Sequence, residues 1–370
     1  MRVYFPLLCF YPSQAGGPAN TIYWLSEELA RSGITSIVTA TEHGLDREFS
    51  VLDYNKLNEI RFVPRLVDFF RYKEIRKMLE SDVVYFSSLF FYPTPFLLLI
   101  YYYFGRKSII IAPRGELFPA AISKSNFKKR VFLKVLGKVQ SNISFHVTSP
   151  EEFVLVQKTF PKARNVKIIP NYQPIDSLAN VENEGYVLFL GRINPIKNLE
   201  VAIKALQLLK LERGLALNLN IAGEALLPAE KEYMTMLKVL AADCGVSKQV
   251  NFIGKIQGRE KHDYLQKALC LVLPSHSENF GNVVVEALSR GTPVIASNNT
   301  PWSVLSDLDI GFCGELNPGI IADQIIKLFV LSDIEYERVA QKAHAYVADS
   351  FDISKNKSKW VNFFNDMRET

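Results

Sequence analysis

The stretch Leu269–Ser297 constrains the fold of this chain more than any other. It opens with an apolar run typical of a buried strand, continues through the polar turn Pro274–Gly281, and starts a helix near Asn282. A Gly-Thr-Pro sequence ends that helix, and Val294–Ser297 forms a second apolar strand. Strand, helix and strand in this order form the βαβ unit of a parallel sheet, in which ligands lie at the carboxyl ends of the strands.

The same alternation of apolar strands and helices runs through the rest of the chain. Further strands are expected at Val3–Phe10, Thr35–Thr41, Glu59–Pro64, Val83–Ser87, Ser108–Ala112, Ser144–Thr148, Val166–Pro170, Tyr186–Leu190 and Val250–Ile253. With 370 residues the chain is long enough for two hydrophobic cores. The pattern predicts an α/β protein with two Rossmann-like, doubly wound parallel-sheet domains, at residues 1–172 and 186–350, joined by a polar linker at 173–185.

Charge and cysteine usage narrow the class of protein. Residues 1–180 carry 23 Lys and Arg against 15 Asp and Glu, whereas residues 181–370 carry 20 against 23, so the basic first half is expected to face an anionic partner. The four cysteines lie far apart, which indicates reduced thiols of a cytoplasmic protein. The most apolar segment, Leu89–Phe104, contains two prolines and is too short for a bilayer, and no signal peptide is recognised, so we expect no transmembrane helix.

The polar turn before the helix at Asn282 is the first candidate site. Glu278 lies in this turn, and Glu286 lies on an otherwise apolar helix, where a carboxylate is costly without a partner. The free N–H groups of the first helical turn favour an anion such as phosphate. Two carboxylates beside such a helix end suit a sugar nucleotide. An equally good interpretation is a solvated Glu278 and a Glu286 paired with a structural Arg or Lys.

A second candidate site follows the strand Tyr186–Leu190. Gly191 and Arg192 begin a turn that reaches Lys197 just before the next helix. Cations are disfavoured at the start of a helix, so this position favours a bound anion over surface charge alone. Arg binds phosphate as a planar fork and Lys as a point charge, and together they can neutralise a diphosphate.

These residues resemble a known family. Glu278 and Glu286, in SENFGNVVVEAL followed by GTPVIAS, are similar to the signature of glycosyltransferase family 4, the retaining nucleotide-sugar enzymes of GT-B fold. The resemblance implies two domains facing across a cleft, with the last helix, at 351–370, packing back on the first domain. It also implies that Glu278 lies by the donor sugar, that Glu286 binds the ribose, and that Arg192 and Lys197 hold the leaving diphosphate.

The resemblance implies further donor contacts. Gly17 corresponds to a glycine loop across the cleft from the donor phosphates, although a glycine pair there is also typical of a simple turn. Gly223 matches a donor loop whose second glycine is replaced here by Ala225, and Ile256 matches a segment that frames the base. Trp302 borders the donor sugar or belongs to the core. The remaining expected donor-binding residues are Gly191, Asn279, Phe280, Gly281 and Asn282.

The acceptor side is expected in the first half. Arg114 and Glu116 follow a strand in a Pro-Arg-Gly segment that resembles one branch of family 4. A surface Arg and a helix-capping Glu are an equally good interpretation.

Farther along the first half, Lys124, Lys128, Lys134 and Lys138 share one side of an expected helix. They could rest on anionic lipid or form an ordinary solvated face. The family's lipid-linked glycan acceptors favour contact with the cytoplasmic face of a membrane.

No metal ligands or nucleic-acid motif are recognised. Asp307 and Asp309 form an Asp-x-Asp sequence, but their setting indicates a turn, and the five His are scattered. We therefore expect no metal requirement, no cofactor and no nucleic-acid partner. The resemblance implies a retaining glycosyltransferase in which Arg192, Lys197 and Glu278 are catalytic.

The expected donor is a UDP-, GDP- or ADP-sugar, and the expected acceptor is a glycan or lipid-linked glycan of surface polysaccharide synthesis. The alternatives are a sugar phosphorylase, a nucleotide-sugar epimerase, or a non-catalytic lipid- or nucleic-acid-binding protein.

Overall fold

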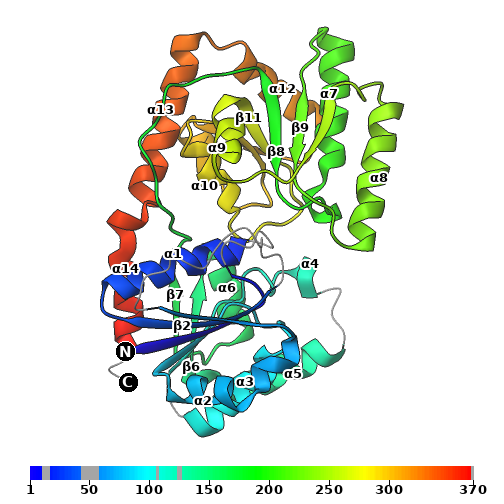
Figure 1. Ribbon diagram of the computed structural model, residues 1–370. Coiled ribbons are helices and arrows are strands. Elements are labelled where there is room, and N and C mark those ends of the chain that lie inside the picture. Colours follow the sequence, from blue (N-terminus) through cyan, green and yellow to red (C-terminus); the bar gives the residue numbers. More distant parts are fainter. Residues whose placement is uncertain (11–16, 43–57, 106–107, 123–126, 368–370) are drawn as a thin grey trace. The chain divides into compact units, whose positions relative to one another are not determined.

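Two parallel β-sheets organise the chain in the computed structural model, which describes residues 1–10, 17–42, 58–105, 108–122 and 127–367 (Figure 1). The chain divides into two compact units. The first consists of Met1–Pro174 and Phe351–Thr370, and the second of Ile175–Ser350. The two sheets confirm the α/β fold class predicted from the alternation of strands and helices.

The first unit is built on a seven-stranded sheet in which neighbouring strands are parallel. Its order is β3-β2-β1-β4-β5-β6-β7, so the winding reverses between β1 and β4, as in a doubly wound fold. The strands are β1 (Arg2–Leu7), β2 (Thr35–Thr41), β3 (Glu59–Val63), β4 (Val83–Phe86), β5 (Ser108–Ile111), β6 (Ile143–Val147) and β7 (Asn165–Ile168).

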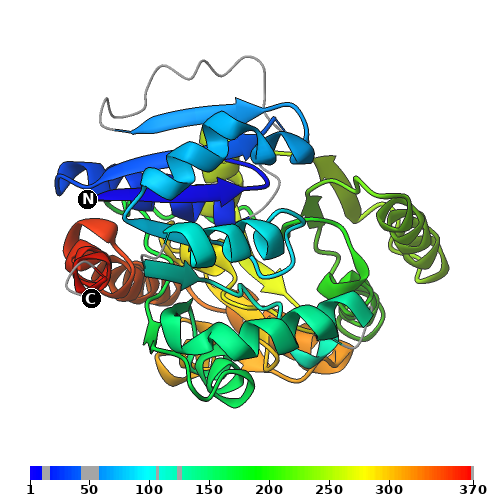
Figure 2. The same cartoon turned by 90° about the horizontal axis from the view of Figure 1, so that it is seen from below.

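Both faces of the central strands of this sheet are buried. Val3 and Phe5 pack in one hydrophobic cluster with α1 (Gly17–Arg31), whereas Tyr4 between them packs in the cluster on the opposite face. Because alternate residues of a strand point to opposite faces, a strand buried on both sides must be apolar throughout. The second face is covered by α2 (Tyr72–Glu80), α3 (Thr94–Ile100), α5 (Phe127–Val139) and α6 (Pro150–Thr159), of which α2, α3 and α5 face the viewer in Figure 2.

Among the described residues of the first unit, four short elements complete the connections. They are the 3₁₀ turns η2 (Leu66–Phe70) and η4 (Gln140–Asn142), the π-helical turn η3 (Tyr101–Gly105) and the helix α4 (Pro119–Ile122). The apolar segment Leu89–Phe104 therefore contains α3, which is continued by η3.

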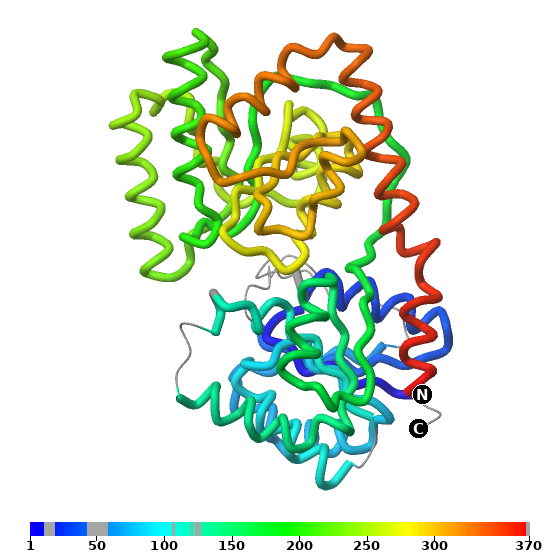
Figure 3. The backbone as a smooth tube through the Cα atoms, turned by 180° about the vertical axis from the view of Figure 1, so that it is seen from behind, coloured from blue at the N-terminus to red at the C-terminus, as the bar shows by residue number. Residues whose placement is uncertain are grey.

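The last helix, α14 (Ile353–Asp366), belongs to the first unit. Trp360 and Phe364 are buried in the same cluster as Val3 and Phe5, and Ser108 donates a hydrogen bond to the carbonyl of Met367 at 2.8 Å. The tube in Figure 3 shows the chain passing from α13 (Asp333–Ser350) of the second unit directly into α14. The first domain therefore consists of two separate segments of the sequence.

The second unit is built on a six-stranded parallel sheet of order β10-β9-β8-β11-β12-β13. Its strands are β8 (Tyr186–Leu190), β9 (Leu219–Ala222), β10 (Val250–Gly254), β11 (Ala268–Leu273), β12 (Val294–Ser297) and β13 (Gly311–Gly314). Besides α13, its helices are η5 (Pro195–Lys197), α7 (Leu199–Arg213), α8 (Pro228–Asp243), α9 (Gly258–Lys267), α10 (Asn282–Leu288), α11 (Val304–Asp307) and α12 (Pro318–Phe329).

The polar segment expected as a linker, 173–185, is held along the second unit from Ile175 onward. Asp176 pairs with Arg290 at 2.8 Å, and the carbonyl of Asn180 accepts a hydrogen bond from Gln266 at 2.7 Å. Glu184 pairs with Lys267 at 2.8 Å. This segment is therefore fixed by side chains of α9 and of the turn after α10.

Candidate active site

Two loops meet at the carboxyl edge of the second sheet. One follows β8 and ends with Lys197, and the other follows β11 and carries Glu278. Lys197 Nζ donates to Glu278 Oε2 at 2.5 Å, and both side chains are largely buried, with 17% and 18% of their surface exposed. The backbone N–H of His276 also donates to the carbonyl of Ile196 at 2.8 Å. Two residues that are 81 positions apart in the chain are thus brought into direct contact.

Backbone turns fix the position of Lys197. Asn194 is extended and precedes the 3₁₀ turn η5, after which Asn198 adopts a left-handed conformation with φ 50°. Asn tolerates this region better than most residues, so the chain can change direction sharply before α7. The first N–H of α7, on Leu199, donates to the hydroxyl of Tyr233 at 2.9 Å. Lys197 is therefore held between a rigid turn and an anchored helix.

Gly191 and Gly223 allow the loops after β8 and β9 to touch. A Cβ added to Gly223 would lie 1.8 Å from the carbonyl oxygen of Gly191, and Gly223 has φ 154°. The N–H of Gly191 donates to the carbonyl of Ala222 at 3.0 Å, and the N–H of Gly223 donates to the carbonyl of Gly254 at 2.7 Å. Only glycine fits this close approach, so position 223 requires glycine for packing. This requirement is independent of Ala225, the residue in place of the second glycine of the donor loop.

Arg192 lies on the same turn with its guanidinium more than half exposed. Its Nη1 is 3.9 Å from Glu230 Oε1, near the limit for an ion pair. The other oxygen of Glu230 accepts hydrogen bonds from the N–H groups of Leu226 and Leu227 at 2.9 and 3.1 Å, at the start of α8. The weak contact with Glu230 leaves the Arg192 guanidinium accessible to a further anion.

The turn after Glu278 is supported from the core. Gly281 has φ 79°, and a Cβ there would lie 3.2 Å from Glu278 Cγ, so the turn requires glycine. Trp302 is 2% exposed and donates its indole N–H to the carbonyl of Phe280, whose ring centroid lies 5.5 Å away. Trp302 is therefore a core residue that holds the turn. Asn279 and Asn282 are partly exposed on either side of Phe280 and Gly281.

Glu286 has a partner that the sequence did not indicate. Lys261 of α9 pairs with Glu286 Oε1 at 3.1 Å, and both side chains are about four-fifths buried. The next residue, His262, accepts a hydrogen bond at Nδ1 from Arg290 Nη2 at 3.2 Å, because a guanidinium only donates. Burial and the Arg290 charge lower the pKa of His262, so the ring accepts at Nδ1 in its neutral form. Of the two interpretations of Glu286, the pairing with a basic residue is observed, through Oε1 alone.

Arg114 joins a buried network in the first unit. It follows β5 in a left-handed conformation, φ 54°, and donates to Asn171 Oδ1 at 2.6 Å and to the Tyr85 hydroxyl at 3.2 Å. Tyr85 lies 2.6 Å from His146 Nδ1, and His146 Nε2 lies 2.7 Å from the carbonyl of Ile169. Nε2 must carry the proton because a carbonyl only accepts, so Nδ1 accepts from Tyr85. Burial and the Arg114 charge lower the pKa of His146 well below its ordinary value.

Glu116 holds the loop after β4. Its carboxylate accepts hydrogen bonds from the Ser88 hydroxyl at 2.6 Å and from the N–H groups of Leu89 and Phe90 at 2.5 and 3.2 Å. Burial raises the pKa of Glu116, while these donors act in the opposite direction. Glu116 therefore fixes the loop that leads into α3.

The other expected residues have simple positions. Gly17 is the first described residue of α1, and the preceding part of its glycine loop, 11–16, lies outside the described residues. Ile256 is buried just after β10. Lys128, Lys134 and Lys138 are exposed on α5, whereas Lys124 lies outside the described residues. Asp307 ends α11 and Asp309 is left-handed, which confirms a turn.

The described residues contain no group of three His, Cys, Asp or Glu side chains that could hold a metal ion. Among the helices described, none is long and apolar enough to cross a bilayer.

The fold and the loops define the class of protein. Two doubly wound parallel-sheet units, the second with basic and acidic side chains at the carboxyl ends of its strands, are the architecture of GT-B glycosyltransferases. Residues 174–345 match the family described as glycosyl transferases group 1. The chain therefore has the GT-B fold, and most of its second unit is similar to the group 1 glycosyltransferases.

Comparison with individual proteins gives the same class. The D-inositol 3-phosphate glycosyltransferase of Pseudarthrobacter chlorophenolicus is 37% identical over 113 residues, which cover 30% of this chain and 26% of that protein. The alignment thus spans about a quarter of the length of this relative.

Solved structures match nearly the whole fold at low identity. Sucrose-phosphate synthase from Thermosynechococcus elongatus has a TM-score of 0.74 and 16% identity, covering 99% of both chains. Anabaena HepE in complex with UDP-glucose also has a TM-score of 0.74 and 16% identity, covering 99% of this chain and all of that one.

Proposed function

We propose that this protein transfers a sugar from a nucleotide-sugar donor to an acceptor hydroxyl. The observation that carries the proposal is the contact of Lys197 with Glu278 beside Arg192, at the carboxyl edge of a group 1 glycosyltransferase unit. Phosphate binding at this edge is the usual role of such loops in parallel α/β sheets. UDP-sugars come first in the donor search because HepE, which shares the fold, was crystallised with UDP-glucose.

In this proposal the donor diphosphate takes the place of Glu278 as the counter-ion of Lys197. The ammonium group is already oriented at the turn, so binding costs little reorganisation. Arg192 adds its exposed guanidinium to the same phosphates and stabilises the charge that grows on the leaving group. Glu278, once released from Lys197, accepts hydrogen bonds from donor-sugar hydroxyls, and Glu286 accepts from the ribose.

Retention at the anomeric carbon is part of the proposal. The leaving diphosphate takes the acceptor proton on the same face of the sugar, and no metal ion is required because the two cations and the N–H groups of the α10 turn face the phosphates. Full turnover in excess chelator, together with an unchanged anomeric configuration by NMR, would support both points. Loss of activity in chelator that only added divalent metal restores would contradict metal independence.

Turnover of Arg192→Ala provides the direct test. We expect it to fall by about 100-fold or more, because a charge that acts mainly in the transition state is lost. Arg213→Ala is the matched control, since Arg213 has the same exposed fraction, 55%, and a surface pair with Asp323 at 3.4 Å. Equal turnover of the two variants would refute the role of Arg192.

The reaction class is tested with the same purified enzyme. A transferase releases nucleoside diphosphate only when an acceptor hydroxyl is present. An epimerase converts the donor alone, and a phosphorylase uses inorganic phosphate as acceptor. A non-catalytic binding protein without a donor site would show no thermal shift with any of UDP, GDP and ADP.

We assign the acceptor side to the first unit, around Arg114 and Glu116. Both act through the backbone that they hold: Arg114 through Asn171 and Tyr85, and Glu116 through the loop before α3. Arg114→Lys should therefore raise the KM for acceptor more than the KM for donor. The reverse order would contradict this assignment.

We also propose that α5 rests on an anionic membrane surface, which suits a lipid-linked glycan acceptor of surface polysaccharide synthesis. Phe127, Val131 and Val135 recur every four residues and are 80%, 41% and 36% exposed, so they form an apolar stripe on the helix. The exposed Lys128, Lys134 and Lys138 lie beside this stripe. An apolar stripe flanked by lysines is typical of helices that lie in a lipid interface.

The neighbouring loop extends this surface. Lys129 lies 4.6 Å from the ring centroid of Phe90, and the Phe90 and Phe132 rings are 6.4 Å apart, which ties α5 to the segment before α3. Tyr92 of that segment and Phe96 of α3 are 54% and 51% exposed. Aromatic side chains of this kind are common at membrane interfaces.

Vesicle flotation tests the membrane proposal. Wild type should float with vesicles of phosphatidylglycerol and phosphatidylcholine, and less so at high salt or with phosphatidylcholine alone. Phe127→Ser should weaken binding, whereas Leu211→Ser, at a 71% exposed position of the second unit, should not. A second comparison uses two triple variants with Lys replaced by Glu. The test variant changes Lys128, Lys134 and Lys138, and the control variant changes Lys204, Lys231 and Lys248. Binding that is absent, or equal in test and control variants, would exclude α5 as the contact.

A further inference from the structure

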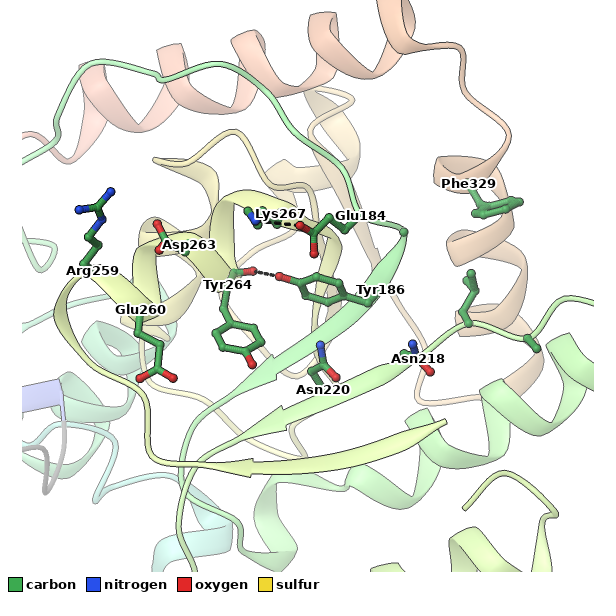
Figure 4. A pocket seen from close by; sticks show the side chains of 13 residues that line it. Glu184, Tyr186, Asn218, Asn220, Arg259, Glu260, Asp263, Tyr264, Lys267 and Phe329 are labelled. Carbon is green, nitrogen blue, oxygen red and sulfur yellow. Dashed lines mark hydrogen bonds and ion pairs between the residues drawn. The ribbon is translucent and has the colours of Figure 1, made fainter. Parts of the chain in front are cut away.

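A hollow of about 880 Å³ lies at the amino ends of β8 and β9 in the second unit (Figure 4). It is lined by Gly185 and Tyr186 at the start of β8, by Asn218 just before β9, by Asn220 of β9, and by one side of α9. In a parallel sheet the amino and carboxyl ends of strands form opposite edges. The hollow is therefore distinct from the loops that carry Lys197 and Glu278.

The topology explains why this part of the sheet is open. The helix α9 connects β10 to β11 and packs against β8 and β11. It therefore does not run along the two outer strands, β9 and β10. A parallel sheet covered on both faces has apolar strands. Here β9 and β10 present Asn220 and Asn251 instead, and the Nδ2 group of Asn251 donates to Asn220 Oδ1 at 3.0 Å.

Two tyrosines form the wall of the hollow on the α9 side. The Tyr186 hydroxyl donates to the backbone carbonyl of Tyr264 at 2.8 Å, and the ring centroids are 6.2 Å apart at 69°. Tyr186 is almost fully buried, whereas Tyr264 is partly exposed. Figure 4 shows the Tyr264 ring extending from α9 toward Asn220. A partly exposed ring thus extends toward an amide whose oxygen already accepts a hydrogen bond from Asn251.

The charges of the hollow select against anions. Lys267 is engaged by Glu184 at 2.8 Å. Of the other charged residues that line it, Glu260 and Asp263 carry carboxylates, whereas Arg259 alone carries a positive charge. Phosphates and nucleotides would meet a net negative lining. A neutral ligand rich in hydroxyl donors would instead find carboxylate acceptors, an amide and an aromatic face.

We propose that this hollow is a second carbohydrate site, which binds a neutral glycan chain by packing a sugar ring on Tyr264 and by hydrogen bonds to Asn220 and Glu260. Its position away from the donor loops makes it a holding site for a glycan and not part of the transfer chemistry. The inference does not depend on the proposed transferase activity, because binding can be measured without turnover.

The test uses the full chain and five neutral probes: maltohexaose, isomaltohexaose, cellohexaose, chitopentaose and mannopentaose. Saturation-transfer NMR and calorimetry, up to about 10 mM of each, cover affinities that a single sugar-binding hollow provides. We expect at least one probe to bind and Tyr264→Ala to weaken its binding by about tenfold or more, since one aromatic contact commonly carries this share of an affinity. Glu260→Ala, at an exposed position, should weaken it too.

Controls separate this site from the fold and from the donor loops. Tyr264→Phe keeps the ring and should keep most of the affinity, and Tyr346→Ala, at a partly exposed tyrosine of α13, should leave it unchanged. A saturating nucleoside diphosphate should not displace the glycan. The proposal is overturned if none of the five probes binds, if Tyr264→Ala and Glu260→Ala bind as wild type does, or if the nucleotide displaces the glycan.

Discussion

Replacing Gly223 with alanine should destabilise the second unit severely, because no space exists for a methyl group. The new Cβ would lie 1.8 Å from the carbonyl oxygen of Gly191, so the two loops would have to separate. Separation breaks the hydrogen bonds from Gly191 to Ala222 and from Gly223 to Gly254, each of which contributes about 1 kcal/mol.

The backbone adds a second cost. Gly223 has φ 154°, a conformation that residues with a Cβ avoid, and such strain costs about 1 to 3 kcal/mol. The free energy of unfolding of the second unit should therefore fall by about 3 to 5 kcal/mol. Donor binding should be lost with it, because Arg192 lies on the turn that moves.

Hydrogen exchange read by mass spectrometry measures this effect for each unit separately. Peptides of β8 and β9 should lose protection in Gly223→Ala, whereas peptides of β1 and β4 should not. Gly214→Ala is the control: Gly214 is left-handed, φ 62°, with no atom within 4 Å of an added Cβ among the described residues, so only about 1 to 2 kcal/mol of strain is expected. Equal losses in the two variants would refute the argument from close approach.

Other predictions follow from single contacts. His146 is buried with a pKa well below 6.5, so the unfolded chain binds a proton more readily than the folded chain does. The free energy of unfolding should therefore fall as the pH drops below about 6.5, by up to about 1.4 kcal/mol per pH unit. His146→Gln should reduce this slope in acid titrations. Lys261→Met should weaken nucleotide binding about tenfold in calorimetry, because Glu286 loses the partner that orients it; unchanged affinity would show that Glu286 needs no support. Glu116→Gln should lower the stability of the first unit by about 2 kcal/mol in urea unfolding, because an amide group would face three hydrogen-bond donors; wild-type stability would contradict this.

The fold could be predicted because its strands are apolar on both faces. Val3, Tyr4 and Phe5 fill two clusters at once, and Leu269–Leu273 is buried throughout, so such strands stand out in the sequence. The strand β13, Gly311–Gly314, did not, because two of its four residues are glycine and it lies at the edge of the sheet. The segment after Asn171 reads as a linker because it is polar, yet its polar groups bind α9 and Arg290.

The site was predictable only in part. The turns with Lys197 and Glu278 could be located because both follow apolar strands of one sheet, whose carboxyl ends share an edge. Lys261 could not be identified, since nothing in the sequence shows which helix faces Glu286. The Pro-Arg-Gly segment drew attention to Arg114, but its partners Tyr85 and Asn171 lie on other strands and loops. On a helical wheel Leu136 and Val139 lie opposite the lysines of α5, and both are buried, but the exposed stripe of Phe127, Val131 and Val135 was not predicted.

The central claim is that Lys197 and Arg192 bind the diphosphate of the donor. Its most direct measurement compares the affinity of wild type and of the double variant Lys197→Met/Arg192→Gln for a nucleoside diphosphate and for the corresponding nucleoside, with the base taken from the donor screen. The claim predicts that wild type binds the diphosphate much more tightly and that the double variant loses this preference while its affinity for the nucleoside stays the same. A double variant that keeps the full preference for the diphosphate would contradict it.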